Sequence, residues 1–370
     1  MTIPCSLRRF GTAIFAAVAL GGLAMPASAT TILFVGNSFT YGDPAGAKPP
    51  IVQNYRPDTV TDLNGRGIGG VPALFKAMTM QAGLDYQVSL ETEPGSGLDF
   101  HYKNRLNTIV KPFDMVLLQS YSTLDGARPG NPETLIRYSG LLANAFREQN
   151  PDVDVRLTST WSRADLTYQN ANSPWFGKSI CAMAQDVRAG YDAADSASNI
   201  ISGVIPVGQA WNQAIAGGLA DANPYDGIGA GQINLWAPDS YHGSNYGYYL
   251  EALTIFGNVT GLDPRSLGAD DYVARDLGIN VATALALQGF AAAQLEAEAV
   301  RSPACWPCLQ PSTACWSPCA AVVAMPRHAT AHTPDIARSR VDILRLLTVT
   351  APAQVPSWSS SSSSPGPGST

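Results

Sequence analysis

The sequence predicts an α/β protein built on an open parallel sheet with helices on both of its faces. Five short runs of apolar and β-branched residues have the composition of fully buried strands. Longer segments with helical spacing separate most of these runs, which is the alternation that a parallel sheet needs. Hydrophobic residues make up 45% of the 370 residues, enough for a substantial core. The predicted strands are Thr31–Val35, Tyr86–Leu90, Asp114–Leu118, Val153–Thr160 and Ile201–Val207.

Five further segments place apolar residues at helical spacing. The predicted helices are Val71–Ala82, Glu133–Gln149, Ser179–Ala194, Ser244–Gly257 and Ala274–Val300. Two segments, 41–66 and 161–176, fit neither pattern. Long irregular segments in compact domains are often functional. Each of these two segments could form a wall of a substrate groove, and the alternative is an ordinary surface loop.

The N-terminus predicts export. Arg8 and Arg9 precede an apolar stretch from Phe10 to Leu23, and Ala27-Ser28-Ala29 matches a signal-peptidase site. The alternative is a membrane anchor, but the apolar stretch is short for a bilayer span and no stop-transfer pattern follows. We therefore expect residues 1–29 to be a bacterial-type signal peptide. The mature protein would be secreted or periplasmic and would have no integral membrane segment.

The composition changes near residue 301. Residues 301–370 are rich in Pro, Cys and Ser, which predicts a mostly disordered tail behind a folded domain at 30–300. An out-of-frame extension would also explain the abrupt change. The tail holds Cys305, Cys308, Cys315 and Cys319, whose spacing only loosely resembles that of zinc ligands. We interpret them as incidental or disulfide-paired and predict no metal site.

The charge of the chain bears on its partners. The formal net charge is -6, and charged residues make up 14% of the chain without forming a basic stripe. Proteins that bind nucleic acids present clustered positive charge to the phosphates. The sequence therefore predicts no nucleic-acid partner.

The strongest chemical signal is a serine placed just after the first strand. The run Ile32–Val35 leads through Gly36 and Asn37 to Ser38, so the hydroxyl would lie at the carboxyl edge of the sheet, where such sheets bind ligands. Serines are also common helix N-caps, and this motif alone favours an enzyme only modestly.

A serine nucleophile needs a base, and residues 30–300 contain only two histidines, His101 and His242. Asp239 lies three residues before His242 in a turn that begins with Pro238. At this spacing the carboxylate can accept a hydrogen bond from the imidazole Nδ1 and fix the tautomer. The alternative is a capping aspartate beside a surface histidine. We predict Ser38, Asp239 and His242 as the catalytic residues.

Two motifs resemble the first and last conserved blocks of the SGNH/GDSL hydrolases. These are Gly36-Asn37-Ser38-Phe39-Thr40, with Asn in place of the usual Asp, and Asp239-Ser240-Tyr241-His242. The resemblance covers roughly residues 30–263. It implies a flavodoxin-like three-layer α/β/α sandwich, here with a five-stranded parallel sheet. It also implies a serine esterase that needs no cofactor.

The same resemblance implies an oxyanion hole formed by backbone and side-chain donors. We expect the N–H groups of Ser38 and Gly95 to take part, with Gly97 as the second choice for the glycine. The common Gly-x-Asn-Asp block is absent after the third strand, and a relative group with a Leu-Gln motif there suggests the Gln119 amide as third donor.

The remaining site predictions concern the substrate. We predict that Asn37, His101 and Trp211 contact it, although His101 also fits a structural role and Trp211 could belong to the core. Export and polar, aromatic loops favour acetyl esters of carbohydrates. A lipase or short-chain acyl esterase, and a catalytically silent carbohydrate-binding protein, are the alternatives. The partner in each case is a small-molecule or carbohydrate ester or glycan.

Overall fold

The computed structural model describes residues 29–43 and 51–301. Almost all of the predicted signal peptide and of the predicted tail, including its four cysteines, lies outside these residues. The boundaries proposed for the folded domain at 30–300 therefore remain a prediction.

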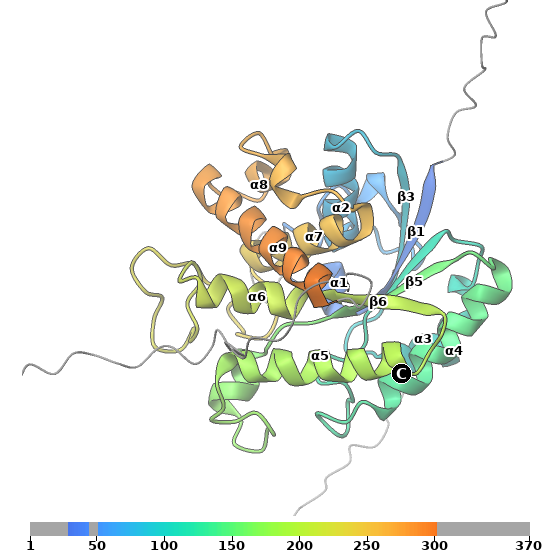
Figure 1. The fold of residues 1–370 in the computed structure, drawn as a ribbon, viewed down its shortest axis with the longest axis horizontal. Coiled ribbons are helices and arrows are strands. Elements are labelled where there is room, and N and C mark those ends of the chain that lie inside the picture. The colour runs from blue at the N-terminus through green and yellow to red at the C-terminus, as the bar shows by residue number, and fades with distance from the viewer. Residues whose placement is uncertain (1–28, 44–50, 302–370) are drawn as a thin grey trace, which may run out of the picture. The chain divides into compact units, whose positions relative to one another are not determined.

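A six-stranded sheet forms the centre of the described protein (Figure 1). The strands are β1 (Thr30–Gly36), β2 (Thr61–Asp62), β3 (Tyr86–Thr92), β4 (Met115–Leu118), β5 (Asp154–Ser159) and β6 (Ile201–Pro206). Their order is β2-β3-β1-β4-β5-β6, and all neighbours are parallel. Without β2 this is the flavodoxin-like order, in which the second strand lies beside the first and the others follow on its far side. The predicted fold class is confirmed.

The prediction of five strands is wrong by one. β2 is only two residues long and pairs with β3 at the edge of the sheet, inside the segment predicted to be a loop. Two residues carry no periodicity, so the hydrophobic pattern could not indicate this strand.

Helices cover both faces of the sheet and complete three layers. They are α1 (Ser38–Tyr41), α2 (Gly70–Gln81), α3 (Leu98–Ile109), α4 (Glu133–Gln149), α5 (Ile180–Ser196), α6 (Val207–Ala216), α7 (Asn245–Thr260), α8 (Tyr272–Asp276) and α9 (Val281–Arg301). Figure 1 shows α3, α4 and α5 on one side of the sheet and α2, α7 and α9 on the other. The central strand alternates accordingly, with Ile32 and Phe34 in one core cluster and Leu33 and Val35 in the other.

Several helices differ from the sequence prediction. The polar helix α3 was not predicted, although a parallel connection from β3 requires a crossover of this kind. Helix α6, which begins directly after β6, was not predicted, and its first residue, Val207, was assigned to the strand. The predicted helix 274–300 is divided into α8 and α9, because Gly278 adopts a left-handed φ of 74° between them.

One acidic residue is buried beneath the carboxyl edge of the sheet. Glu251 of α7 is almost completely buried, and its Oε2 has no hydrogen-bond partner. It lines a cavity of about 10 Å³ together with Thr40 and Gln119. Burial raises the pKa of Glu251 well above its ordinary value. The carboxyl group is therefore neutral in the folded protein over a wider pH range than in the unfolded chain.

The substitution Glu251→Gln should stabilise the protein increasingly as the pH rises. The unfolded carboxyl loses its proton near its ordinary pKa of 4.5, whereas the folded one keeps it, so rising pH favours the unfolded wild type. Glutamine ionises in neither state. The advantage should grow by about 1.4 kcal/mol per pH unit until the folded carboxyl ionises. Urea unfolding of both proteins across the mildly acidic to mildly alkaline range measures it. The exposed Glu148→Gln on α4 is the control, and a pH-independent difference for Glu251→Gln would contradict this explanation.

Candidate active site

Ser38 is the first residue of the short helix α1, directly beyond the central strand β1. The Asn37 side chain caps this helix by accepting a hydrogen bond from the Phe39 N–H at 3.1 Å. A Cβ on Gly36 would lie 2.1 Å from Thr40 Oγ1, so the turn needs a glycine there. The structure places Ser38 where the strand-to-turn motif predicted it.

The turn before Ser38 is fastened to the end of β4 by Gln119. Its Oε1 accepts hydrogen bonds from the Asn37 N–H and the Thr40 hydroxyl, both at 3.0 Å. Its Nε2 donates to the Ser120 carbonyl oxygen. Both ends of the buried amide are thus engaged, and the structure assigns Gln119 to holding the turn. Only the second Nε2 proton of Gln119 is left to donate to an oxyanion, as the sequence analysis predicted for this side chain.

Asn37 is likewise a part of the protein scaffold. Its Nδ2 donates to the carbonyl oxygens of Ser96 and Ser120 at 2.8 and 3.2 Å, while its Oδ1 caps α1. Every polar atom of this buried side chain therefore has a partner within the protein. The turn geometry uses the whole amide, so these contacts lend no support to a substrate contact of Asn37, which stays a prediction.

His242 lies in a tight loop before α7 and is paired with Asp239. The imidazole Nδ1 lies 2.6 Å from Asp239 Oδ2, and Oδ1 accepts hydrogen bonds from the N–H groups of Tyr241 and His242, both at 3.0 Å. Burial alone would raise the pKa of Asp239, but these hydrogen bonds outweigh it and leave the pKa below its ordinary value. The carboxylate stays ionised in mild acid. This is the arrangement that the Asp-x-x-His spacing predicted.

The rings of His242, Tyr241 and Phe39 form a three-membered aromatic cluster, in which Phe39 and Tyr241 also contact each other at a centroid distance of 5.4 Å. The Tyr241 ring stacks on the imidazole with centroids 4.0 Å apart, and the Phe39 ring lies 5.6 Å from the imidazole. The guanidinium of Arg163 in turn lies 3.6 Å from the Tyr241 ring centroid, within cation–π distance. Phe39 directly follows Ser38, so this cluster joins the segment that carries the base to the segment that carries the serine.

The segment 161–165 holds the His242 loop from the side of β5. The Trp161 Nε1–H donates to the Tyr241 carbonyl oxygen at 3.1 Å, and the Asp165 N–H donates to the Ser240 carbonyl oxygen at 3.2 Å. Ser240 has a φ of 56°, a conformation that a serine rarely adopts without such external support. Part of the irregular segment 161–176 therefore supports the candidate base.

The structure brings Ser38 and His242 to the same edge of the sheet. Besides the Phe39–His242 contact, the hydroxyl of Tyr248 on α7 donates to the Ser38 carbonyl oxygen at 3.4 Å and to that of Asp43 at 3.2 Å, as alternatives for its one proton. Burial raises the pKa of Tyr248, which keeps the hydroxyl a donor. The His242 Nε2 is buried and has no hydrogen-bond partner among the described residues, so it makes no hydrogen bond with the Ser38 hydroxyl.

The loop after β3 lies beside this edge. Gly95 adopts a left-handed φ of 65°, and the adjacent Ser96 accepts the hydrogen bond from Asn37 described above. Gly97 caps α3, and a Cβ on it would lie 2.2 Å from the Tyr121 ring. The loop 93–97 that carries both candidate oxyanion glycines is therefore in contact with the serine turn.

The other two predicted substrate contacts are wrong. His101 has no exposed surface and is enclosed among Glu91, Ser96 and α3, so no substrate can reach it. Trp211 is 1% exposed and stacks on Trp161 at a centroid distance of 4.4 Å, as part of the core. Hydrophobic periodicity could not separate these buried residues from groove-lining ones, because both kinds occur at strand and helix ends.

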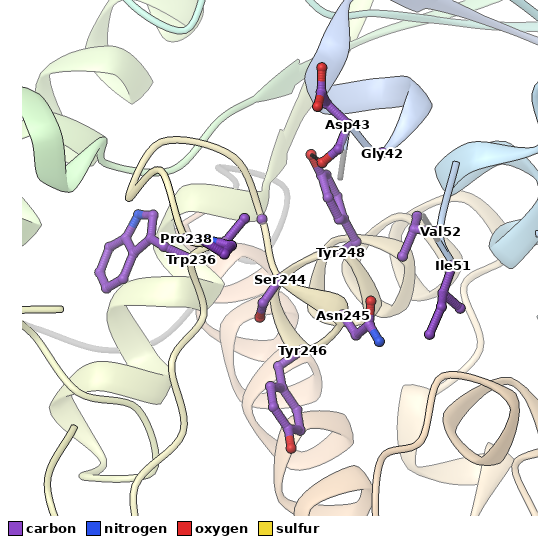
Figure 2. Close-up of a pocket in the computed structure, with 12 residues that line it drawn as sticks. Gly42, Asp43, Ile51, Val52, Trp236, Pro238, Ser244, Asn245, Tyr246 and Tyr248 are labelled. Carbon is purple, nitrogen blue, oxygen red and sulfur yellow. Dashed lines mark hydrogen bonds between the residues drawn. The ribbon is translucent and has the colours of Figure 1, made fainter. Parts of the chain in front are cut away.

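A pocket of about 250 Å³ lies between the segments that carry Ser38 and His242. Figure 2 shows Trp236 and Pro238 on one side of it and Ile51 and Val52 on the other, with Tyr248 between. Gly42 and Asp43 follow α1, while Ala237 and Gly243 flank the Asp239–His242 pair. The pocket is therefore adjacent to both candidate catalytic segments.

The described residues contain neither a metal-ligand cluster nor a membrane-spanning helix. Within 29–43 and 51–301, no group of three or more His, Cys, Asp or Glu side chains is arranged to hold a metal ion. In that part of the chain, no helix combines the length and the apolar character that crossing a bilayer would take.

Several contributors to the site were not predicted. Tyr241 and Phe39 contact the His242 ring, and Glu91 pairs with His101. Tyr241 and Phe39 are the sequence neighbours of His242 and Ser38, which is a signal that sequence reasoning could have used. Glu91 is the acidic residue of β3 and is fully buried, and a buried ionisable side chain needs a partner.

Comparisons with known proteins are limited to solved structures, since no protein-family model matches the chain and no curated protein matches it significantly. A GDSL-like lipase from Parabacteroides merdae is 18% identical with a TM-score of 0.43, and the match covers 63% of this chain and 96% of that protein. An acetyl xylan esterase from Geobacillus stearothermophilus is 15% identical with a TM-score of 0.38, covering 68% and 95%. A family 3 carbohydrate esterase from Clostridium thermocellum is 15% identical with a TM-score of 0.39, covering 61% and 93%.

Replacing Gln119 by alanine should destabilise the protein by about 1–3 kcal/mol. The change leaves the buried Asn37 N–H and Thr40 hydroxyl without their acceptor, a cost typical of unpaired buried polar groups. Chemical unfolding measures the loss, and Gln149→Ala at an exposed position on α4 is the control. Equal stability of the two variants would show that Gln119 does not hold the turn.

Proposed function

We propose that this protein is an exported serine esterase of the SGNH/GDSL superfamily, with Ser38 as nucleophile and His242 as general base. The observation that carries the proposal is the 2.6 Å hydrogen bond between Asp239 and the His242 Nδ1, which leaves Nε2 unpartnered beside the Ser38 turn. An imidazole held in this way presents a lone pair on Nε2, as acyl-transfer catalysis requires. Export follows from the N-terminal sequence alone.

The mechanism is a two-step acyl transfer. His242 Nε2 takes the proton of the Ser38 hydroxyl, whose oxygen attacks the ester carbonyl carbon. The tetrahedral intermediate then expels the alcohol, which receives the proton from the imidazolium, and an acyl group remains on Ser38. Water repeats the sequence with His242 as base and releases the acid. The ionised Asp239 stabilises the imidazolium in both steps.

The developing oxyanion needs hydrogen-bond donors. The backbone N–H groups of Ser38 and Gly95 are the proposed donors, because the loop 93–97 contacts the serine turn through Ser96 and Asn37. Preorganised donors of this kind typically lower the barrier by a few kcal/mol each. Gln119 supports them by fixing the turn on which Ser38 lies.

The proposed substrates are acetyl esters of carbohydrates. The pocket beside the catalytic segments combines aromatic walls from Trp236 and Tyr246 with polar groups of Asp43 and Asn245, a mixture that suits one sugar ring. A small acetyl group needs no further cavity. Longer acyl esters, as a lipase would hydrolyse, form the competing enzymatic proposal.

A catalytically silent carbohydrate-binding protein is the second candidate. One observation favours it: Ser38 and the His242 Nε2 make no hydrogen bond. In hydrolases without bound substrate this hydrogen bond is often long and forms only in the complex, so the observation does not exclude catalysis.

The substitution Ser38→Ala should lower ester hydrolysis by about a thousand-fold or more and abolish labelling by a fluorophosphonate. His242→Ala should have a similar effect, and Asp239→Asn a smaller one, because His242 transfers the proton itself. Hydrolysis of acetylated sugars and labelled-peptide mapping measure these effects, with unfolding curves to check that the variants fold. A wild type that binds glycans but neither hydrolyses esters nor takes the label would support the silent protein instead.

Filling the pocket should separate large substrates from small ones. Ile51→Trp narrows it, so KM for an acetylated disaccharide should rise about tenfold, the effect of about 1.4 kcal/mol of lost contact, while ethyl acetate is hydrolysed nearly as before. Ile51→Ala is the matched control that leaves the pocket open. A selective loss on long-chain acyl esters would indicate that the pocket receives the acyl group.

A further inference from the structure

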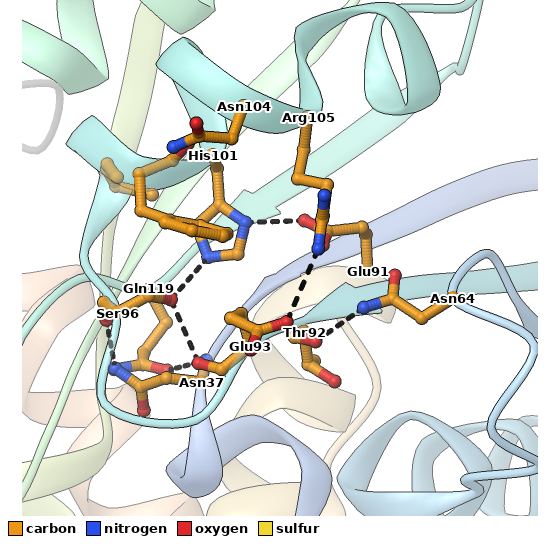
Figure 3. Close-up of polar contacts among 12 residues, drawn as sticks. Asn37, Asn64, Glu91, Thr92, Glu93, Ser96, His101, Asn104, Arg105 and Gln119 are labelled. Carbon is orange, nitrogen blue, oxygen red and sulfur yellow. Dashed lines mark hydrogen bonds and ion pairs between the residues drawn. The ribbon is translucent and has the colours of Figure 1, made fainter.

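A second Ser–His–carboxylate chain lies next to the candidate active site and has no part in the mechanism above. His101 Nδ1 lies 2.5 Å from Glu91 Oε2, and His101 Nε2 lies 3.1 Å from the Ser96 hydroxyl oxygen (Figure 3). Glu91 and His101 have no exposed side-chain surface. Arg105 reaches the other Glu91 oxygen at 3.4 Å from a partly exposed position.

The hydrogen bonds of this chain fix Ser96 in either protonation state of His101. The Ser96 hydroxyl has one proton and two neighbours, His101 Nε2 and the Glu93 carbonyl oxygen at 2.9 Å. If His101 is neutral with its proton on Nδ1, Ser96 donates to Nε2. If His101 is an imidazolium, Nε2 donates to Ser96, and Ser96 donates to Glu93. Its oxygen is held in both cases.

Ser96 transmits this constraint to the nucleophile turn. Its carbonyl oxygen accepts the 2.8 Å hydrogen bond from Asn37 Nδ2, and Asn37 caps the helix that begins with Ser38. A continuous series of short contacts therefore runs from Glu91 through His101, Ser96 and Asn37 to Ser38. Gly95, the proposed oxyanion donor, lies within the loop that Ser96 anchors.

We propose that Glu91 and His101 are positioning residues that align the loop 93–97 with the Ser38 turn. This inference rests on the proposed esterase function. A buried carboxylate and a buried imidazole lower the stability of the fold unless they are paired. Here the paired His101 also contacts the hydroxyl of Ser96 in the loop 93–97. An apolar side chain could fill the same space, but it could not fix the Ser96 hydroxyl. Small misplacements at a reacting centre reduce the rate strongly, so the alignment acts on the chemical step.

The rival explanation is that Ser96 is itself a nucleophile. The geometry of Ser96, His101 and Glu91 meets the requirements of a triad, but enclosure of both partners leaves no space for a substrate carbonyl beside His101. The two explanations assign the reactive serine differently, so the same experiment separates them.

Two substitutions of His101 form the matched pair for the test. In His101→Gln the longer amide can reach the Nε2 position and keep the contact with Ser96. In His101→Asn the shorter amide can keep the contact with Glu91 and loses the one with Ser96. Both remove the ring, so both lose packing. Ser96→Ala removes only the hydroxyl and serves as the third variant, which does not disturb the His101–Glu91 pair.

We expect His101→Asn and Ser96→Ala to lower kcat by about ten- to a hundred-fold with KM nearly unchanged. His101→Gln should keep most of the wild-type kcat, and the fluorophosphonate should label Ser38 in every variant that reacts. Unfolding curves show whether stability follows a different order from kcat.

Equal kcat values for the two His101 variants, or a change confined to KM or to stability, would overturn the positioning proposal while the esterase function stands. Labelling of Ser96 would also overturn it and would replace the proposed nucleophile. A wild type without hydrolysis or labelling would remove the esterase function and this proposal together.

Discussion

The rim of the sheet depends on one shared acceptor, the side-chain carbonyl oxygen of Gln119. It receives both the Asn37 N–H and the Thr40 hydroxyl, while the Gln119 N–H extends the β1–β4 ladder to the Val35 carbonyl oxygen at 2.9 Å. Gln119 therefore fixes the position of the Ser38 turn relative to the paired strands β1 and β4. A displacement of that turn would leave buried polar groups without partners, which costs more than a single net hydrogen bond contributes. The Gln119 oxygen thus sets the position of the Ser38 turn, and the other contacts of the site adjust it.

The fold was largely predictable because buried parallel strands have a strong sequence signal. The five predicted strands all exist, and their alternation with helices led to the right layer architecture. The signal failed where it was too short or too polar. β2 has two residues, α3 carries few apolar residues, and the break between α8 and α9 depends on the φ angle of Gly278. Such features follow from tertiary pairing and backbone conformation, which periodicity does not report.

The candidate site was predictable where it depends on local spacing. Asp239 and His242 are three residues apart, so the turn itself brings their side chains together. Long-range partners were not predictable in this way. Asn37 and Trp211 contact residues distant in sequence, Ser120 and Trp161, and His101 pairs with Glu91 across the connection from β3 to α3. A single sequence indicates which residue types lie at the rim, but it does not indicate which of them turn inward.

The aromatic contacts of His242 restrict how the ring can move. The imidazole is hydrogen-bonded at Nδ1, stacks on Tyr241 and contacts Phe39, so a rotation about its Cα–Cβ bond would break these three contacts. Under the proposed mechanism, His242 Nε2 therefore transfers protons at the same position in acylation and in deacylation. The departing alcohol and the incoming water must accordingly occupy the same space in succession. An alcohol that dissociates slowly would block the entry of water and so slow deacylation. For bulky esters, dissociation of the alcohol rather than bond cleavage would then be the rate-limiting step.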